Sequence, residues 1–196
     1  MRRPWRCCHH CRMPDVRYVT QGTRAAIRRT TREDGAEFVR LARESAAFHR
    51  PWLTLPTTER AYLHYIGQLE REDREGFLVC VRETGDIAGF ININNIVRGA
   101  FQCGSIGYGA FPPAAGQGYM SEGLGLVLRH AFGPLGLHRV EVNIQPGNKA
   151  SIGLVKRHGF RLEGFSPDFL YIEGAWRDHE RWAMTSDMLD QRTGAG

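Results

Sequence analysis

Two glycines in one turn of the chain could hold a phosphate group. Residues 108–122 run from a strand-like stretch through two prolines to Gly116 and Gly118, and an amphipathic helix pattern begins directly afterwards. The first N–H groups of a helix have no partner within it, and the helix dipole favours negative charge at that end. Glycine lets a phosphate approach the backbone because it has no Cβ. The segment therefore predicts an anion site suited to a diphosphate.

The same spacing also has a purely structural explanation. Gly-x-Gly before a helix is typical of a tight strand-to-helix turn. Two other phosphate-binding motifs do not fit, because no Gly-Lys-Ser/Thr follows the glycines and no Gly-x-Gly-x-x-Gly follows an early strand. The glycine pair alone therefore leaves the ligand open.

Cysteine and histidine are concentrated in residues 7–11, which read CCHHC. Both are zinc-ligand types, but adjacent ligands cannot easily close a tetrahedron and no second pair follows nearby. We therefore expect no metal site, and we expect residues 1–12 to be disordered or a mis-annotated leader, since Met13 would serve equally well as a start. Cys80 and Cys103 lie in strand-like surroundings and are expected to be buried free thiols.

Positive charge is concentrated at the start of the chain. Residues 1–32 hold nine arginines and one acidic residue, Asp15, whereas the formal net charge of the whole chain is +5. A basic arm can bind nucleic acid, but the net negative remainder has no basic stripe with interleaved aromatic residues, which argues against direct nucleic-acid binding. No stretch approaches the ~18 apolar residues of a membrane span, and no apolar run follows the basic start as in a signal peptide. We expect a cytoplasmic protein.

Hydrophobic periodicity predicts the elements that would position the glycine turn. Strand patterns occur at 25–29, 77–81, 91–94, 102–111 and 139–144, and two more share residues 160–186. Helix patterns follow Thr31 and residues 57–58, begin after Gly118, and run from Asn148 to Gly159. The order β-α-α-β-β-β-α-β-α-β-β predicts a single α/β domain with a mixed central sheet flanked by helices.

The turn and its surroundings resemble the coenzyme A motif of the GNAT superfamily of N-acetyltransferases. That motif reads Arg/Gln-x-x-Gly-x-Gly/Ala, and the matching residues are Ala115, Gly116, Gln117, Gly118, Tyr119 and Met120. Ala115 lacks the long polar side chain of the family, and Met120 replaces a small residue. Because backbone donors do most of the phosphate binding in this family, Ala115 affects the expected affinity more than the expected function.

Seven ordered blocks narrow the resemblance to ribosomal-protein alanine acetyltransferases of the RimJ/RimL type, RimJ more than RimL. The blocks are 48–52, 94–101, 118–122, 137–140, 148–151, 158–164 and 176–179. They imply an N-acetyltransferase domain at 25–186, between a basic extension at 1–24 and a tail at 187–196. The implied reaction transfers acetyl from acetyl-CoA to a primary amine, here the N-terminal α-amine of a protein such as a ribosomal protein. The sequence leaves the oligomeric state open.

The resemblance also implies how the cofactor is held. Strands 102–111 and 139–144 are expected to separate around the pantetheine arm, so that backbone groups of Tyr108, Gly109 and Ala110 bind its amides and polarise the thioester carbonyl. Asn148 is expected to contact the arm, although capping a helix would also explain it. Ser151 resembles the serine proposed to protonate the leaving thiolate, although a serine in the first turn of a helix is often only a local hydrogen-bonder.

The general base is left unassigned by the resemblance. The glutamate of the RimL-type pattern falls at Leu170, which cannot accept a proton. An α-amine with a pKa near ~7.8 is roughly one-tenth neutral at pH ~7, whereas lysine near ~10.4 is almost wholly charged, which favours N-terminal substrates. Glu163, Asp168 and Glu173 could act through water, or they could simply be solvated. Trp52 could line the amine pocket or pack between helices.

Two other functions remain open at the level of sequence. One is acetylation of a small amine such as an antibiotic or polyamine, which a pocket rich in acids would support. The other is a non-catalytic protein that binds acyl-CoA or aids ribosome assembly through its basic arm.

Overall fold

The computed structural model describes residues 17–193. These residues fold around one mixed sheet. Its strand order is β1-β2-β3-β4-β5-β6-β8-β7. The strands are β1 (Thr20–Gln21), β2 (Ala25–Arg29), β3 (Glu75–Val81), β4 (Ile87–Val97), β5 (Cys103–Ala110), β6 (Arg139–Ile144), β7 (Arg161–Ile172) and β8 (Ala175–Thr185). The helices are η1 (Arg32–Asp34), α1 (Gly35–Glu44), α2 (Ala46–His49), α3 (Glu59–Leu69), η2 (Pro112–Ala114), α4 (Tyr119–Phe132), α5 (Lys149–His158) and α6 (Ser186–Thr193).

The sheet is divided at its centre. Among the described strands, all neighbouring pairs are antiparallel except β5 and β6. These two run parallel because the connection between them contains the crossover helix α4. This pairing spans only Cys103 to Ser105 against Arg139 to Glu141. Beyond Ser105 the two strands are no longer paired, as the family resemblance implied, and one edge of β5 faces a gap.

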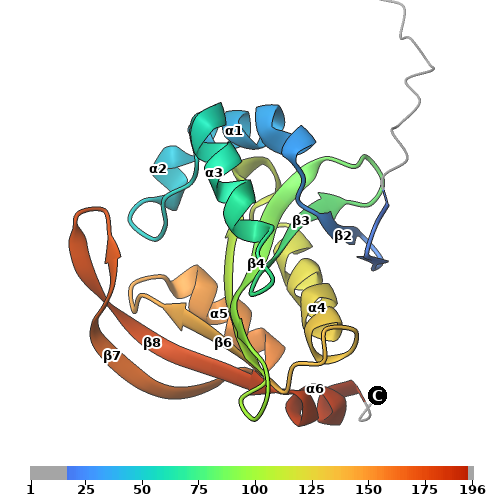
Figure 1. Ribbon diagram of the computed structural model, residues 1–196, viewed down its shortest axis with the longest axis vertical. Helices are drawn as coiled ribbons and strands as arrows, with labels where there is room; N and C mark the ends of the chain where they lie inside the picture. Colours follow the sequence, from blue (N-terminus) through green and yellow to red (C-terminus); the bar gives the residue numbers. More distant parts are fainter. Residues whose placement is uncertain (1–16, 194–196) are drawn as a thin grey trace, which may run out of the picture.

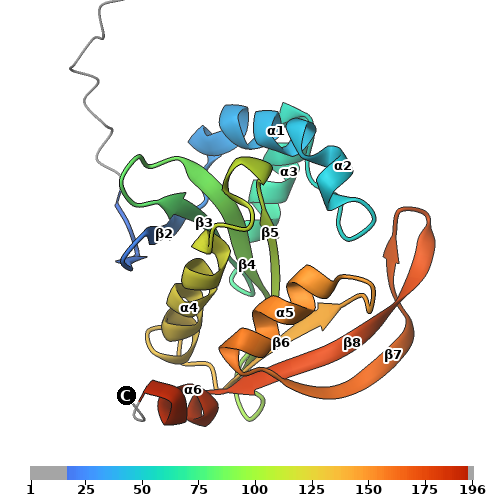
Figure 2. The same cartoon turned by 180° about the vertical axis from the view of Figure 1, so that it is seen from behind.

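Side-chain alternation builds a core on each face of the sheet. In β4, Ile91 and Ile93 pack with α4 and α5, whereas Phe90 packs with α1 and α3 on the opposite face. Figures 1 and 2 show α1, α2 and α3 over one side and α4 and α5 over the other. Because α5 covers β6 and β8 on the α4 side alone, the opposite face of these strands is left for the loop after α2 and for the β7–β8 hairpin.

Short local signals fix where the helices begin and end. Thr31 and Asp34 form a capping box at the predicted helix start, which opens η1 just before α1. Thr58 caps α3, since its side chain accepts a hydrogen bond from the Ala61 N–H at 3.2 Å. Gly159 ends α5 with a φ of 84°, a left-handed conformation that glycine adopts without a Cβ penalty.

The predicted order of strands and α-helices is confirmed, with three additions besides the short 3-10 helices η1 and η2. β1, the short α2 and the C-terminal α6 were not expected, and β1 and α6 extend regular structure beyond residues 25–186 on both sides. Cys80 and Cys103 are buried free thiols, as predicted. The CCHHC run lies outside the described residues. Among the described helices, none is long and apolar enough to cross a membrane.

Candidate active site

The glycine turn leads directly into the first N–H groups of α4. Gly116 and Gly118 have φ angles of 74° and 89°, which L side chains rarely adopt. Nothing lies within 4 Å of a Cβ built on Gly116, so conformation rather than crowding requires glycine there. Among the described residues no side chain caps the start of α4. Its N–H groups therefore remain free for an anion.

Arg24 adds a fixed positive charge beside this turn. Its guanidinium donates a hydrogen bond to the Gln117 carbonyl at 3.0 Å and lies over the Tyr119 ring, 4.8 Å from the centroid. The Glu122 carboxylate accepts hydrogen bonds from the N–H groups of Arg24 and Ala25, at 3.0 and 3.2 Å, which ties the start of β2 to α4. Sequence reasoning missed Arg24, because no local motif links it to a turn 93 residues away.

The two departures from the family motif have different structural settings. Met120 directs its sulfur towards Gly89, where an added Cβ would meet the Sδ atom at 2.4 Å. The large side chain therefore packs against β4 and leaves the start of the helix clear. Ala115 is half-buried in the turn, and Gln117 closes the turn by donating to the Pro113 carbonyl at 2.7 Å.

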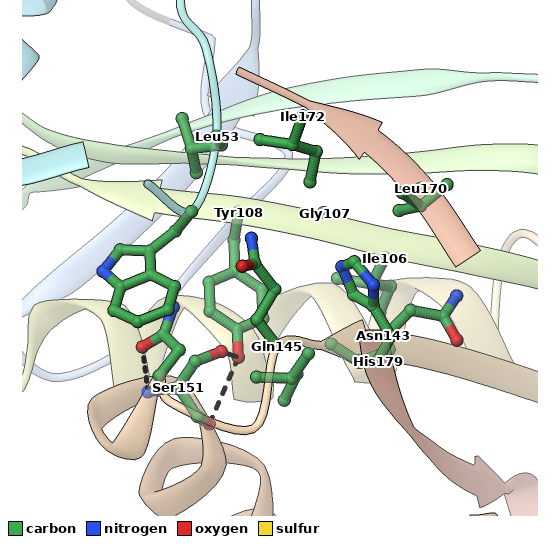
Figure 3. Close-up of a pocket in the computed structure, with 14 residues that line it drawn as sticks. Leu53, Ile106, Gly107, Tyr108, Asn143, Gln145, Ser151, Leu170, Ile172 and His179 are labelled. Atoms are coloured by element: carbon green, nitrogen blue, oxygen red, sulfur yellow. Dashed lines mark hydrogen bonds between the residues drawn. The ribbon is translucent and has the colours of Figure 1, made fainter. Parts of the chain in front are cut away.

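A cavity of about 140 Å³ opens where β5 and β6 separate. It is lined by Trp52, Leu53, Ile106, Gly107, Tyr108, Val142, Asn143, Ile144, Gln145, Asn148, Ser151, Leu170, Ile172 and His179 (Figure 3). Three predicted site residues, Tyr108, Asn148 and Ser151, are among them. Gly109 and Ala110 continue β5 beyond the cavity, and residues 115–120 lie at the start of α4.

Tyr108 and Ser151 form a hydroxyl pair in this cavity. Their oxygens are 2.6 Å apart, and Asn148 fixes Ser151 by accepting its N–H at 3.1 Å as the cap of α5 (Figure 3). Burial raises the pKa of Tyr108 to about 12, and the hydrogen bond to Ser151 opposes this only in part. The phenol therefore keeps its proton at neutral pH, so the pair can donate a proton but not accept one as a base.

Polar contacts connect the two walls of the cavity. Thr54, in the loop after α2, donates to the Glu173 carboxylate of the β7–β8 hairpin at 2.9 Å. Gln145 donates to the Pro51 carbonyl at 3.1 Å. Trp52 lines the cavity and lies beside Gly147, where an added Cβ would come within 3.1 Å of its ring. These contacts hold the loop after α2 against the far side of the cavity.

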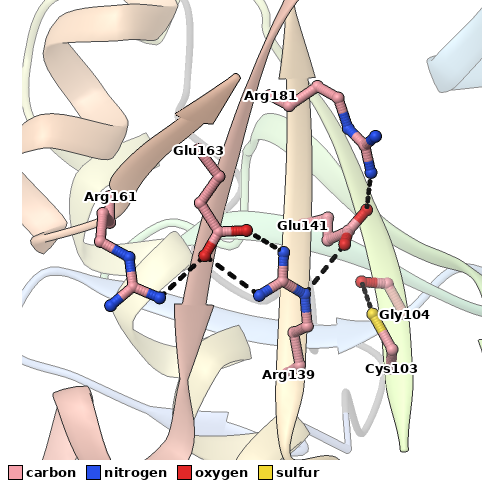
Figure 4. Close-up of polar contacts among 7 residues, drawn as sticks. All are labelled: Cys103, Gly104, Arg139, Glu141, Arg161, Glu163 and Arg181. Carbon is pink, nitrogen blue, oxygen red and sulfur yellow. Dashed lines mark hydrogen bonds and ion pairs between the residues drawn. The ribbon is translucent and has the colours of Figure 1, made fainter. Parts of the chain in front are cut away.

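The carboxylates that the sequence nominated as bases lie outside the cavity lining. Glu163 binds Arg139 and Arg161 in a surface network that includes Glu141 (Figure 4). These hydrogen bonds, chiefly that from Arg139, lower the pKa of Glu163 to about 2.

Glu173 is held at the hairpin, and Asp168 lies in the bulge of β7, where its N–H donates to the Asp178 carboxylate at 2.9 Å. Leu170 does line the cavity, and so does His179, which the family resemblance included only as the last residue of the block 176–179.

A split mixed sheet, a helix start without a side-chain cap and a buried hydroxyl pair in the gap together suit an acyltransferase that uses a coenzyme A thioester. Residues 24–161 match the family described as Acetyltransferase (GNAT) domain. The chain belongs to the GNAT family of N-acetyltransferases, whose acetyl donor is acetyl-CoA.

Relatives with different substrates share this architecture. The chain is 30% identical over 182 residues to the [Ribosomal protein uS5]-alanine N-acetyltransferase of Escherichia coli, covering 89% of this chain and 93% of the relative. RimJ of Mycobacterium smegmatis, in complex with CoA-disulfide, superposes with a TM-score of 0.79 at 25% identity over 88% of this chain and 89% of that chain. Spermidine N-acetyltransferase of Vibrio cholerae, in complex with CoA and spermine, gives a TM-score of 0.70 at 17% identity over 85% and 98%. The fold therefore does not by itself select the amine.

Proposed function

We propose that this enzyme acetylates the N-terminal α-amine of a protein, with a ribosomal protein as the physiological substrate. The observation that carries the proposal is the chemistry of the cavity, in which none of the fourteen lining residues is Asp or Glu. A polyamine or aminoglycoside carries several ammonium groups, and burying unpaired charges is costly. A peptide N-terminus brings one amine on an otherwise neutral backbone, which suits such a lining.

The similarity to the uS5-alanine enzyme supports the same substrate class, since it extends over 89% of this chain. The ordinary pKa of an α-amine also fits, because roughly one-tenth of it is neutral at pH ~7 without help. Such a substrate is made in the cytoplasm, the compartment that the sequence predicts.

The residues that we assign to the cofactor follow the gap in the sheet. The N–H groups of residues 116–120 and the Arg24 guanidinium would bind the diphosphate, so that Arg24 supplies the cation that Ala115 lacks. The free edge of β5 at Tyr108, Gly109 and Ala110 would bind the pantetheine arm, together with Asn148. The thioester supplies an activated acetyl group. Ser151, paired with Tyr108, would give a proton to the departing sulfur.

The proposal is tested by thiol release from acetyl-CoA, using peptides that begin with free Ala or Ser and matched N-blocked peptides that contain lysine. Turnover of the free N-termini alone, with mass spectrometry placing the acetyl group on the α-nitrogen, is the expected result. Turnover of spermidine or an aminoglycoside with no turnover of peptides would replace the proposal with a small-amine enzyme. Binding of acetyl-CoA without turnover of any amine would favour the non-catalytic function.

A further inference from the structure

A proton acceptor in the cavity would raise the neutral fraction of the bound amine above the one-tenth present in solution, and the lining offers few candidates. An incoming ammonium must lose a proton before its nitrogen can attack the thioester. Tyr108 and His179 are the titratable side chains among the fourteen that line the cavity. Tyr108 is excluded as a base by its pKa, which burial raises to about 12. Among the two, His179 is then the side chain whose ring nitrogen can accept a proton when the imidazole is neutral.

The hydrogen bond of His179 fixes which ring nitrogen is free. The residue lies in β8 and is 2% exposed. Its Nδ1 lies 2.8 Å from the Arg177 carbonyl oxygen, which can only accept, so Nδ1 carries the proton of the neutral ring. The Phe169 ring packs against the imidazole at 5.7 Å. Nε2 is left with a lone pair and has no hydrogen-bond partner among the described residues.

Strand alternation puts His179 on the face of the sheet opposite the hydroxyl pair. In β8, Trp182 and Met184 belong to the core under α4 and α5, which Tyr108 also joins. His179 is an odd number of positions away from both residues along the strand, so its side chain points to the opposite face of the sheet. The amine would therefore meet its proton acceptor, His179, on one face of the sheet. The thiolate would meet its proton donor, the hydroxyl pair, on the other face.

Asn143 places a second acceptor on the His179 face. It pairs with Arg181 across β6 and β8, which makes it a diagonal neighbour of His179 at a spacing of roughly 7–8 Å. Its Oδ1 atom is buried and has no hydrogen-bond partner among the described residues. Both side chains line the cavity (Figure 3). A buried acceptor without a donor is costly, and an amine hydrogen would satisfy it.

We propose that Nε2 of His179 is the general base of this acetyltransferase, and that the Asn143 carboxamide orients the amine by accepting one of its hydrogens. The inference rests on the proposed function. His179 takes one proton from the ammonium and passes it to solvent. The freed lone pair forms the C–N bond, the C–S bond breaks, and the thiolate takes a proton from the hydroxyl pair. The nitrogen loses a second proton as the amide forms, and a proton returns from solvent to the hydroxyl pair, so the net result is one proton released to solvent and one on sulfur.

His179→Asn tests the base directly, because the asparagine amide can still donate to the Arg177 carbonyl while nothing replaces Nε2. Loss of a general base lowers kcat by roughly 100-fold or more at pH ~7. The residual activity should rise with pH until the α-amine is mostly neutral, above pH ~8, so the deficit shrinks in alkali. A deficit that is equal at every pH, or one below about threefold, would overturn the proposal.

His49→Asn is the matched control. His49 is also buried, at 4% exposure, and its Nε2 lacks a described partner, but it packs beside Phe48 and Phe111 and is not among the residues lining the cavity. Its substitution should leave the pH profile unchanged. The KM for acetyl-CoA should change in neither variant.

A readout that needs no turnover separates this inference from the proposed substrate. Long-range 1H–15N spectra of histidine-labelled protein, assigned through His179→Asn, report which ring nitrogen bears hydrogen. The expected result is protonated Nδ1, with an Nε2 signal that moves when CoA and a free-N-terminal peptide are added but not with the N-acetylated peptide. A proton on Nε2 would overturn the inference. If the wild type acetylates only a small amine, the substrate proposal fails and the same pH comparison is made with that amine.

Discussion

The hydroxyl oxygens of Tyr108 and Ser151 are 2.6 Å apart, although the two residues come from a strand and a helix on opposite sides of the gap in the sheet. The distance is short for two neutral hydroxyls, so each side chain is held in place by the other. We therefore expect the pair to act as one unit in catalysis.

Ser151→Ala should lower kcat by about 10- to 100-fold, since a proton donor to the thiolate is lost. Tyr108→Phe should have a smaller effect, because the serine can draw its proton from water. The double variant should be no slower than Ser151→Ala alone, since groups in one network are not additive. Steady-state kinetics of the three variants measure this, and multiplicative losses would contradict a shared role.

Arg24→Gln should raise the KM for acetyl-CoA by about tenfold while kcat stays within about twofold, since a charge-assisted contact to phosphate contributes roughly 1.5–3 kcal/mol. The increase should diminish at high salt because the contact is exposed. Arg82→Gln is the matched control, since Arg82 donates to the Gly22 carbonyl nearby, at 2.9 Å, rather than to the turn. Equal effects of the two substitutions would show that only general charge matters.

Gly118→Ala should destabilise the protein by about 1–3 kcal/mol and weaken acetyl-CoA binding, because alanine resists a φ of 89°. Gly67→Ala serves as the opposite case. Gly67 lies within α3, and nothing lies within 4 Å of an added Cβ there. That substitution should stabilise by about 0.5–1 kcal/mol. Urea unfolding of both variants, with acetyl-CoA titrated separately, tests the pair of expectations.

Sequence alone predicted the parts of the site that are contiguous in the chain. The turn at 115–120 and the Asn148–Ser151 spacing are local, and the structure places the turn at the start of α4 and places Asn148 and Ser151 in the lining of the cavity. Arg24 reaches the turn from 93 residues away, and His179 and Asn143 come together only through the pairing of β6 with β8. The pattern of residues along one strand does not determine its register against another strand. No local signal could therefore have predicted that these residues lie close together.

Acid should destabilise the protein through Glu75, which accepts hydrogen bonds from Arg29 and His130 at 2.9 and 2.7 Å. Burial acts to raise the pKa of Glu75, but the bonds from His130 and Arg29 together outweigh it and lower the pKa to about 2. A depressed pKa in the folded state means that the stabilisation is complete above the unfolded value near 4.5 and is lost as the pH falls towards 2. Urea unfolding at pH 7, 5 and 3 should show a loss that Glu75→Gln reduces but does not abolish, since glutamine does not titrate whereas Glu163, whose pKa is also lowered to about 2, still does. An identical pH dependence in the variant would contradict this assignment.

Leu170→Glu tests whether this enzyme lacks a general base or has its general base at a position other than 170. Leu170 lines the cavity and is the position where the RimL-type pattern has a glutamate. If His179 already removes the proton, adding the carboxylate to the wild type should leave kcat at pH 7 within about twofold. In the His179→Asn background the same substitution should recover at least about tenfold in kcat, because a carboxylate beside the amine can take over the proton transfer. A large gain in the wild-type background would mean instead that this enzyme works without an effective base, and that the α-amine must arrive already neutral.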